Sequence, residues 1–398
     1  MQTDMLKGKL ITLCVTGGIA AYKAPILVRR LKEKAAIVQV IMTKNAENFV
    51  TPLALETVSN NKVIYSLFNE GDNIKVEHID IADKSDFIVI APASANIIGK
   101  IANGIADDFL SSMILAYTKK VLFVPAMNVN MYNNPIVQKN MEFLNSFENY
   151  YFMEALEGDL ACGYSGKGRM PDPPLIVNEI EYLLTEKPLR NKKILITAGA
   201  TKEYIDPVRY ISNPSTGKMG YALASQAIKL GATVTLLSHK GCLELPYRVN
   251  KVDYFTSVDS LKELIDKYID EHDLIIMSAA VGDIKIKNYN TQKIKKNNKS
   301  WDLEFSSTPD VLKSIQHKKI FKIGFAAESN NHSQNAQLKL ENKGLDMIVL
   351  NDISREDIGF QSDFNQITIF TKNNSKSFDK LSKEETAIKI LEEYIKFT

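Results

Sequence analysis

The sequence predicts an α/β protein of two doubly wound, Rossmann-like domains, each with a mainly parallel sheet. Its 398 residues exceed one ordinary domain and fit two. Short apolar, β-branched runs alternate with helical patterns through both halves, as in strands that helices cover on both faces. An opening of strand, glycine and helix occurs twice, at residues 10–23 and 194–220. Because ligands bind at the carboxyl ends of such strands, the repeat predicts two sites.

The first half alternates strand and helix. Asp172 precedes two prolines, which predicts a helix from this cap to about residue 185. The segment 185–193 is polar and contains a proline, so we expect domains at 1–187 and 188–398. The expected strands are residues 9–15, 37–42, 87–91, 121–124 and 150–152, and the other helices are 21–33, 94–102 and 108–117.

The second half repeats the alternation. A helix over 219–230 is expected to end at Gly231, and Ser382 with Glu385 forms a capping box for a final helix to about residue 396. The lysine-rich segment 285–299 predicts a long exposed loop or hairpin. The expected strands are residues 193–197, 233–238, 274–278, 322–326, 347–350 and 366–370.

The composition narrows the class of protein. A net charge of +2 indicates neither a nucleic-acid nor a membrane partner. Three cysteines are too few for a disulfide framework at this length and indicate a reducing compartment. The N-terminus lacks a signal-peptide layout, and no apolar run approaches the roughly 18 residues of a membrane span. We expect a cytoplasmic protein.

Three segments of the first half carry polar groups at predicted strand ends. Gly17-Gly18 is not a GxGxxG fingerprint. An NAD site would also have an acidic residue after the second strand to bind the ribose, but Thr43-Lys44 stands there instead. An NAD site is therefore disfavoured. A small phosphate or a plain tight turn both fit this glycine pair. Residues 93–96 and 125–132 follow two further strands and offer hydrogen bonds to a flat ligand, although an Asn-rich turn with gap-filling Met explains the second equally well.

His78 and Cys162 are candidate catalytic residues. A lone histidine such as His78 is more often structural than catalytic. Cys162 lies in a Gly-rich, basic loop over 160–170, where cations lower a thiol pKa below its free value near ~8.5. The same loop fits a flap that covers a site.

The first half resembles the flavin-containing cysteine decarboxylases that bind FMN. Four ordered motifs carry the resemblance: His-Ile-Asp at 78–80, Ala-Ser-Ala-Asn at 93–96, Pro-Ala-Met-Asn-x-x-Met-Tyr at 125–132 and Leu-Ala-Cys-Gly at 160–163. It implies a flavodoxin-like fold that is homo-oligomeric, in trimers or multiples such as a dodecamer, with FMN at subunit interfaces. It also implies that His78 is a base, Asn128 holds the substrate carboxylate and Cys162 donates a proton. The implied FMN contacts are Gly17, Gly18, Thr43, Ser94, Asn96 and Ala126.

The second half places several polar motifs after predicted strands. Ser-Thr-Gly-Lys at 215–218 is not a Walker A motif, yet its backbone N–H groups fit a phosphate. Ser215 as an N-cap would leave Asp206, Arg209 and Asn213 unexplained. Asp283 fits a turn cap, a nucleotide contact or a metal ligand. The lysine run that begins at Lys293 fits either a triphosphate or a solvated face.

These motifs resemble phosphopantothenate–cysteine ligases across nearly all of 193–398, and the whole chain is similar to the bifunctional bacterial enzymes of coenzyme A biosynthesis. The resemblance implies that Asn213 acts on an acyl-cytidylate and that Mg²⁺, with Asp283 as its ligand, bridges phosphates. Three departures, Ala200, Gly282 and Ile284, predict altered loop fit. The implied CTP contacts are Ser278, Ala279, Ala280, Asp283, Lys293, Pro309, Asp310, Val311, Leu312, Phe325, Lys339 and Lys343.

The sequence therefore predicts an enzyme with two activities. It joins L-cysteine to 4′-phosphopantothenate with CTP, giving CMP and pyrophosphate, and then decarboxylates 4′-phosphopantothenoylcysteine to 4′-phosphopantetheine with FMN. Two alternatives remain at this stage. One is a decarboxylase of peptide C-terminal cysteine with an inactive second domain, and the other is a non-catalytic flavoprotein that regulates a partner.

Overall fold

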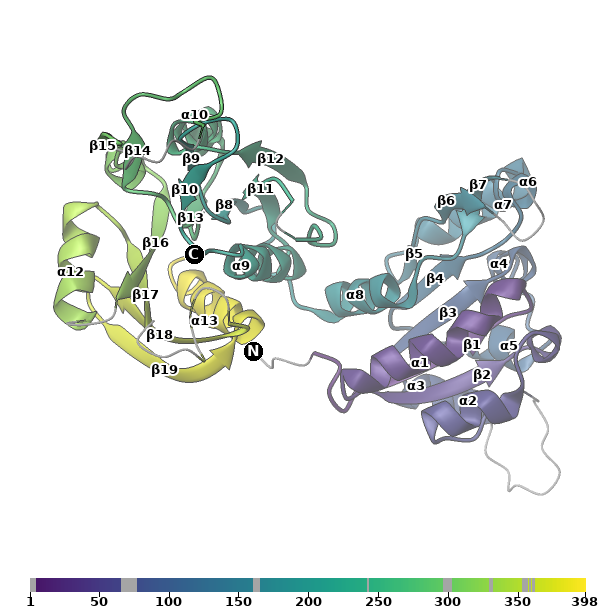
Figure 1. The fold of residues 1–398 in the computed structure, drawn as a ribbon. Helices are drawn as coiled ribbons and strands as arrows, with labels where there is room; N and C mark the ends of the chain where they lie inside the picture. The colour runs from purple at the N-terminus through teal and green to yellow at the C-terminus, as the bar shows by residue number, and fades with distance from the viewer. Residues whose placement is uncertain are drawn as a thin grey trace. The chain divides into compact units, whose positions relative to one another are not determined.

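The computed structural model describes residues 5–65, 77–159, 165–241, 243–295, 303–328, 332–352, 357, 359 and 362–398. One compact unit ends at Thr185 and the other begins at Glu186 (Figure 1). The domain boundary that we predicted after residue 187 remains a prediction. Within the described ranges, no helix is long and apolar enough to cross a membrane.

The first unit contains a five-stranded parallel sheet in the order β2-β1-β3-β4-β5. This is the flavodoxin-like order, and it confirms the predicted fold of the first half. Its strands are apolar because helices cover both faces of the sheet. They are β1 (Leu10–Val15), β2 (Ile37–Met42), β3 (Phe87–Ala93), β4 (Val121–Pro125) and β5 (Tyr150–Phe152).

Helices of the first unit bury their apolar sides against this sheet. Helices α3, α4, α5 and α7 share one core cluster with it, and α1 packs beside α8. A capping box at Asp108 starts α5, whereas the predicted first helix begins as a 3₁₀ turn at Ile19–Lys23. The helices are α1 (Ala24–Glu33), α2 (Pro52–Ser59), α3 (Glu77–Lys84), α4 (Ala95–Ala102), α5 (Phe109–Ala116), α6 (Val129–Tyr132), α7 (Pro135–Asn145) and α8 (Pro173–Leu184).

Asp172 stands at the N-cap of α8, but its carboxylate makes no capping hydrogen bond. The side chain instead accepts a hydrogen bond from the Nζ of Lys23 at 2.7 Å. The predicted N-cap residue is confirmed, and its carboxylate binds Lys23 because a buried ammonium competes for it more strongly than a backbone N–H does.

The second unit contains an eight-stranded sheet in the order β12-β11-β8-β13-β16-β17-β18-β19. The first six strands are parallel in the doubly wound order 3-2-1-4-5-6, and the last two are antiparallel. The mainly parallel sheet that we predicted is confirmed. The strands are β8 (Lys193–Ala198), β11 (Thr233–His239), β12 (Lys251–Phe255), β13 (Leu274–Met277), β16 (Phe321–Glu328), β17 (Met347–Asp352), β18 (Phe364–Thr371) and β19 (Ser375–Ser382).

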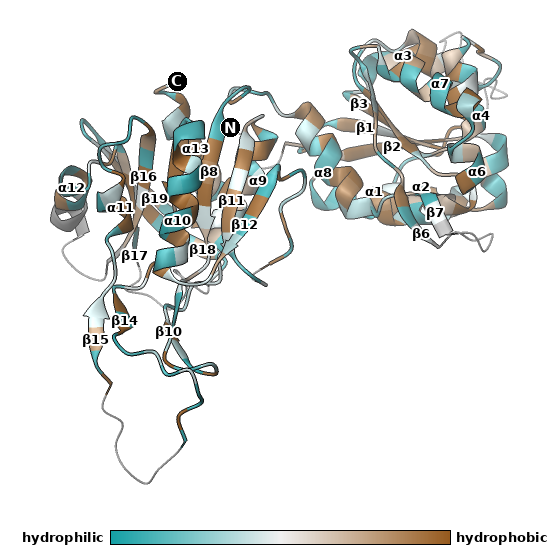
Figure 2. Ribbon diagram, turned by 90° about the horizontal axis from the view of Figure 1, so that it is seen from above, coloured by the Kyte–Doolittle hydropathy of each residue, from teal (hydrophilic) through white to brown (hydrophobic). Residues whose placement is uncertain are grey.

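Helices α9 and α13 pack along each other, and Figure 2 shows hydrophobic segments on the strands behind them. Gly231, with a φ of +96°, follows α9 as predicted, and the capping box of Ser382 and Glu385 starts α13. Leu312 contacts the two core clusters under α10 and α12. The helices are α9 (Lys218–Lys229), α10 (Val258–Tyr268), α11 (Val311–Ser314), α12 (His332–Asn342) and α13 (Lys383–Ile395).

Three two-stranded ribbons complete the described structure. The predicted hairpin near 285–299 corresponds to the β14–β15 pair, although residues 296–302 lie outside the described ranges. Figure 2 shows β10, β14 and β15 extending beyond the body of the second sheet. The ribbons are β6 (Leu156–Asp159) with β7 (Ser165–Arg169), β9 (Lys202–Tyr204) with β10 (Tyr210–Ser212), and β14 (Ile284–Ile286) with β15 (Phe305–Ser307).

Gly220 allows α9 to cross β8 closely, which yields a first prediction. A Cβ at this position would lie 2.5 Å from Ala198 Cβ and 2.7 Å from Ser278 Oγ. We expect Gly220→Ala to destabilise the second unit by about 1–2 kcal/mol, because overpacking outweighs the helix propensity of alanine. Urea denaturation measures the change. Ser225→Ala on the same helix is the control, and equal or higher stability of Gly220→Ala would contradict the close approach.

Candidate functional sites

A cavity of about 730 Å³ opens at the carboxyl edge of the first sheet. Segments that follow β1, β2, β3 and β4 line it, so it lies where the strand order reverses between β1 and β3. Ligands of flavodoxin-like sheets bind at this switch point. The volume lies within the range of small-molecule and cofactor sites.

The buried hydroxyl of Thr16 joins the ends of β1 and β3. It donates to the Pro92 carbonyl at 2.7 Å and accepts from the Ser94 N–H at 3.0 Å. Ser94 in turn caps α4, since its Oγ accepts from the Ile97 N–H. The N-terminus of α4 therefore faces the cavity, and its free N–H groups favour an anionic or carbonyl group there.

The β6–β7 ribbon lies against the segment after β4. The Met127 N–H donates to the Gly168 carbonyl at 3.1 Å, and a Cβ on Gly168, at a φ of +158°, would lie 2.4 Å from Met127 O. The Nζ of Lys23 donates to the Met170 carbonyl just beyond the ribbon. These contacts fix the base of the predicted flap, whose residues 160–164, including Cys162, lie outside the described ranges.

One wall of this cavity carries a fixed charge pair. Lys100 donates to Asp107 at 2.6 Å and to Asp108 at 2.8 Å. Burial works to raise the pKa of Asp108, but hydrogen bonds from Lys100 and Ser111 outweigh it and lower that pKa. Asp108 is therefore ionised at neutral pH.

The structure brings most of the predicted flavin residues together. His78 is the exception: it lies half-buried on α3, with its ring edge-on to Phe109 at a centroid distance of 6.2 Å, and does not line this cavity. The predicted residues that line the cavity are Gly17, Gly18, Thr43, Ser94, Asn96, Ala126 and Asn128.

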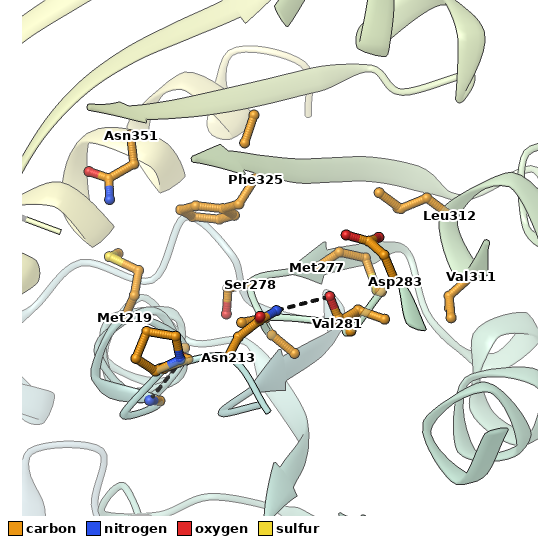
Figure 3. Close-up of a pocket in the computed structure, with 18 of the residues that line it drawn as sticks. Asn213, Met219, Met277, Ser278, Val281, Asp283, Val311, Leu312, Phe325 and Asn351 are labelled. Atoms are coloured by element: carbon orange, nitrogen blue, oxygen red, sulfur yellow. Dashed lines mark hydrogen bonds between the residues drawn. The ribbon is translucent and has the colours of Figure 1, made fainter. Parts of the chain in front are cut away.

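A second cavity, of about 710 Å³, lies at the carboxyl edge of the eight-stranded sheet. It opens between β8 and β13, where the strand order reverses (Figure 3). Asp283, Val311 and Leu312 lie on one side in Figure 3, Met219 and Asn351 on the other, with Ser278 and Phe325 between.

Threonine hydroxyls also join the strand ends here. Thr197 Oγ1 accepts from the Ala279 N–H at 3.1 Å, and Thr201 Oγ1 accepts from the Gly282 N–H at 2.9 Å. Asn213 donates from Nδ2 to the Val281 carbonyl at 3.2 Å, which directs its amide oxygen away from that carbonyl (Figure 3). Segment 278–283 is thus fixed by two threonine hydroxyls and by the Asn213 amide.

The long loop after β8 reaches α9 without a capping serine. Gly217, in the left-handed region at a φ of +79°, is the N-cap, and Ser215 stands two residues earlier. The possibility that Ser215 is an N-cap is therefore excluded. On the opposite wall Asp310 caps α11, and Lys343 lies 3.6 Å from Asp310.

The cavity collects nearly all the predicted ligase residues. Lys293 is the exception, since it is exposed and does not line the cavity. The predicted residues that line it are Asn213, Ser278, Ala279, Ala280, Asp283, Pro309, Asp310, Val311, Leu312, Phe325, Lys339 and Lys343.

Asp206 fixes the segment that carries Lys293. Its carboxylate, inaccessible to solvent, accepts from the Ile294 N–H at 3.1 Å, and Arg209 donates to the Ile294 carbonyl. Burial works to raise the pKa of Asp206, but three backbone N–H groups and the Arg209 guanidinium lower it to about 2. The motif 206–209 is thus an anchor for the lysine run.

The three departures fit the local backbone. Ala200 is buried and pairs with Ala280 in an isolated parallel bridge. A Cβ on Gly282 would make an ordinary contact, 3.4 Å from Thr201 Oγ1, so alanine and glycine both fit. Ile284 is exposed on β14. The predicted change in loop fit remains a prediction.

Sequence reasoning missed the end of the second cavity beside Met219. Asn351, Asn365 and Lys383, which no motif indicated, line it beside Lys218 of the predicted 215–218 segment. A signal was present at Lys383, because a lysine directly after a capping serine opposes the helix dipole.

A resident metal is not favoured by the side chains of the described ranges, which contain no group of three or more His, Cys, Asp or Glu in metal-binding proximity. Asp283 and Asp310 both line the second cavity. Mg²⁺ usually takes one or two carboxylates together with substrate phosphates. The residues present therefore fit a Mg²⁺ ion that enters with a nucleotide.

The Asp206 anchor yields a second prediction. Since the pKa of Asp206 lies near 2, below its ordinary value of 3.8, its carboxylate stabilises the fold above pH 4 and loses this effect as the pH falls towards 2. We expect Asp206→Asn to lower stability at pH 6 and to release the Lys293 segment to trypsin. Urea denaturation at pH 6 and pH 3 should show the difference from wild type shrinking at pH 3.

Asp266→Asn is the control for this prediction, because Asp266 forms an exposed i,i+4 pair with Lys262 on α10. We expect it to change neither stability nor proteolysis measurably. A wild-type-like Asp206→Asn variant at pH 6 would contradict the proposed anchor.

Comparison with known proteins divides the chain in two. Residues 1–185 match the family model named Flavoprotein, and residues 189–397 match that of the DNA/pantothenate metabolism flavoprotein C-terminal domain. The described structure separates into compact units at the same place.

Relatives match almost the whole chain. The coenzyme A biosynthesis bifunctional protein CoaBC of Bacillus subtilis (strain 168) is 43% identical over 395 residues, covering 98% of this chain and 97% of the relative. That of Vibrio vulnificus (strain YJ016) is 42% identical over 401 residues, covering 99% and 98%. A crystal structure of the C-terminal domain of a CoaBC protein is 34% identical, covers 53% of this chain and 98% of its own, and has a TM-score of 0.46.

Proposed function

The chain belongs to the family of bifunctional coenzyme A biosynthesis proteins, and we propose that each of its two clefts is the active site of one of the two reactions. The protein is a bifunctional enzyme with a flavoprotein decarboxylase domain and a ligase domain. The two alternatives, a decarboxylase with an inactive second domain and a non-catalytic flavoprotein, are not supported, because relatives that match nearly the whole chain are bifunctional. The observation that supports the assignment of sites is the gathering of most residues of each motif set, within the described ranges, at a separate switch point.

The second cleft is proposed to join cysteine to 4′-phosphopantothenate. Phe325 and Leu312 offer apolar surface for the base of CTP, and Lys339 and Lys343 offer positive charge. The substrate carboxylate attacks the α-phosphorus of CTP and pyrophosphate leaves, which gives an acyl-cytidylate. The cysteine amine then attacks the acyl carbon, CMP leaves, and an amide forms.

Two residues are proposed to act on these steps. Asn213, held by its Nδ2 on the Val281 carbonyl, would use its amide oxygen to orient the attacking amine. Asp283 would hold a Mg²⁺ ion, which would supply positive charge next to the departing pyrophosphate. Lys293 would approach the phosphates from the segment that Asp206 anchors.

The first cleft is proposed to hold FMN and to decarboxylate 4′-phosphopantothenoylcysteine. The open space beside Gly18 and the free N-terminus of α4 fit a flat, phosphorylated cofactor. FMN would supply a two-electron sink at the thiol-bearing carbon. Asn128, at the N-cap of α6, would hold the substrate carboxylate until CO₂ leaves, and Cys162 would donate the last proton.

Cys14 does not compete for the donor role. It is fully buried in β1, and this burial, with the Asp108 charge, raises the pKa of its thiol strongly. An inert thiol of this kind has a packing role.

His78 is proposed to serve the cleft of a second copy of the chain. It does not line the cleft of its own chain, and exposed apolar residues lie on the 3₁₀ turn Ile19–Lys23 and on α1 and α7 of the same unit, such as Ile19, Ile26 and Ile136. Homo-oligomers in trimers or multiples, such as a dodecamer, would bring the parts together. We also propose that the enzyme works in the cytoplasm.

The direct test uses the full chain with FMN, Mg²⁺, CTP, 4′-phosphopantothenate and carboxyl-labelled cysteine. We expect CMP, pyrophosphate and labelled CO₂ in equal amounts. EDTA should stop CMP formation, while 4′-phosphopantothenoylcysteine added directly should still release CO₂. Absence of both CMP and CO₂ would refute the proposal.

A Cys162→Ser variant separates the two reactions. Without the proposed proton donor, we expect normal CMP formation and accumulation of the oxidised enethiol, detected by mass spectrometry. Cys242→Ser is the matched control and should form 4′-phosphopantetheine normally. Formation of this product by Cys162→Ser at the wild-type rate would show that Cys162 is not the donor.

A further inference from the structure

Lys383 is a buried ammonium that lines the second cleft. It is the first residue of α13 and is 7% exposed. Its Nζ donates to the Gly359 carbonyl at 2.9 Å and to Asn365 Oδ1 at 3.2 Å. Both acceptors are neutral, and in the described part of the chain no carboxylate forms an ion pair with Lys383.

The surroundings of Lys383 disfavour its charge. The start of α13 is the positive end of the helix dipole. Lys218 begins α9, and α9 packs along α13. The Nζ of Lys218 forms an ion pair with Oδ1 of Asp363 at 2.5 Å, and the Asp363 side chain is 74% exposed. Burial, helped by the Lys218 charge and opposed by Asp363, lowers the pKa of Lys383 to about 8.

A purely structural role does not account for this arrangement. Two neutral hydrogen bonds tie α13 to Gly359 and to Asn365 of β18, but any neutral donor of similar length would make these bonds. Burial of a charge without a counter-charge is unfavourable, and buried charges in proteins are normally paired. Since Lys383 lines the cleft and no carboxylate of the described residues forms an ion pair with it, an anion that enters the cleft can supply the counter-charge.

The position of Lys383 in the cleft indicates which kind of anion binds next to it. Asn365, which accepts from Lys383, also contacts Met219 Sδ through Nδ2 at 3.3 Å. Figure 3 places Met219 and Asn351 on the side of the cleft away from Asp283. The buried Oδ1 of Asn351 has no hydrogen-bond partner in the described structure. This side of the cleft therefore carries a polar atom that can still accept a hydrogen bond.

We propose that Lys383, with Lys218, forms a phosphoryl-binding subsite at the Met219 side of the ligase cleft. The inference rests on the proposed function, because the phosphoryl groups available there are the triphosphate of CTP and the 4′-phosphate of phosphopantothenate. Asn365 orients the Lys383 ammonium and is a positioning residue. The bound anion supplies the counter-charge and keeps Lys383 protonated.

The first experiment measures binding of inorganic pyrophosphate to the FMN-loaded full chain by titration calorimetry. For the wild type we expect the affinity to fall about tenfold between pH 7 and pH 9, because Lys383 loses its proton over this range. The charges of Lys218 on α9 and of Asp363 before β18 also act on the Lys383 ammonium. The variants below therefore isolate the contribution of Lys383 to the pH dependence.

Lys383→Met should bind pyrophosphate about tenfold more weakly than wild type at pH 7, with little further loss at pH 9. Lys383→Arg should keep its affinity from pH 7 to pH 9, since a guanidinium stays charged. Lys389→Met, on the same helix and paired with Glu392, is the control and should match wild type. Wild-type binding by Lys383→Met at pH 7 would overturn the proposal.

If Lys383→Met does not fold, pyrophosphate binding by Lys383→Arg still tests the proposal. A pH dependence equal to that of the wild type would then overturn the proposal, and tighter binding than wild type at pH 9 would support it.

The second experiment identifies the source of the phosphoryl group. Titrations of Lys383→Met with CTP, CMP and 4′-phosphopantothenate are compared with wild type. A loss for CTP with CMP unchanged assigns the subsite to the triphosphate, and a loss confined to 4′-phosphopantothenate assigns it to that substrate. A wild type that forms no CMP but still binds pyrophosphate through Lys383 would refute the proposed function and leave the subsite standing.

Discussion

The two clefts depend on one constraint, the need to satisfy backbone groups where two parallel strands part. Beyond the last paired residues of β1 and β3, or of β8 and β13, N–H and C=O groups lose their ladder partners while they are still shielded from water. Unpaired buried groups of this kind are costly. Threonine hydroxyls replace the missing partners: Thr16 bridges Pro92 and Ser94, and Thr197 and Thr201 hold Ala279 and Gly282. These hydroxyls therefore hold the strand ends in place on both sides of each cleft.

The same constraint leads to different chemistry in the two units because different groups surround the opening. In the first unit small residues, a free helix start and an ionised Asp108 line the opening. In the second unit a long loop, the starts of α9, α11 and α13, and several lysines gather at the edge. A flat cofactor suits the first opening and a polyanion suits the second.

The sequence predicted the central strands well because both faces of those strands are buried and their residues are apolar throughout. It missed β12 and β19, since these strands carry alternating or exposed polar residues at the edge of the sheet. The motifs also predicted which residues line each cleft. They did not show that His78 and Lys293 lie outside the cavities of a single chain, because a motif records residue type and order, whereas position relative to a cleft depends on contacts such as the Asp206 anchor that join distant segments.

Local rules of helix design hold at some helix starts beside the clefts and fail at others, and the failures mark where charge is needed. Asp108 starts α5 with the sign that the helix dipole favours. Lys218 and Lys383 start α9 and α13 with the opposite sign, and Lys383 is buried as well. Natural sequences break such rules mainly at functional sites. A cleft that must bind polyanions gains from positive groups held in place beforehand, even though their mutual repulsion lowers the stability of the empty protein, because an anion that binds the folded state returns that stability on binding.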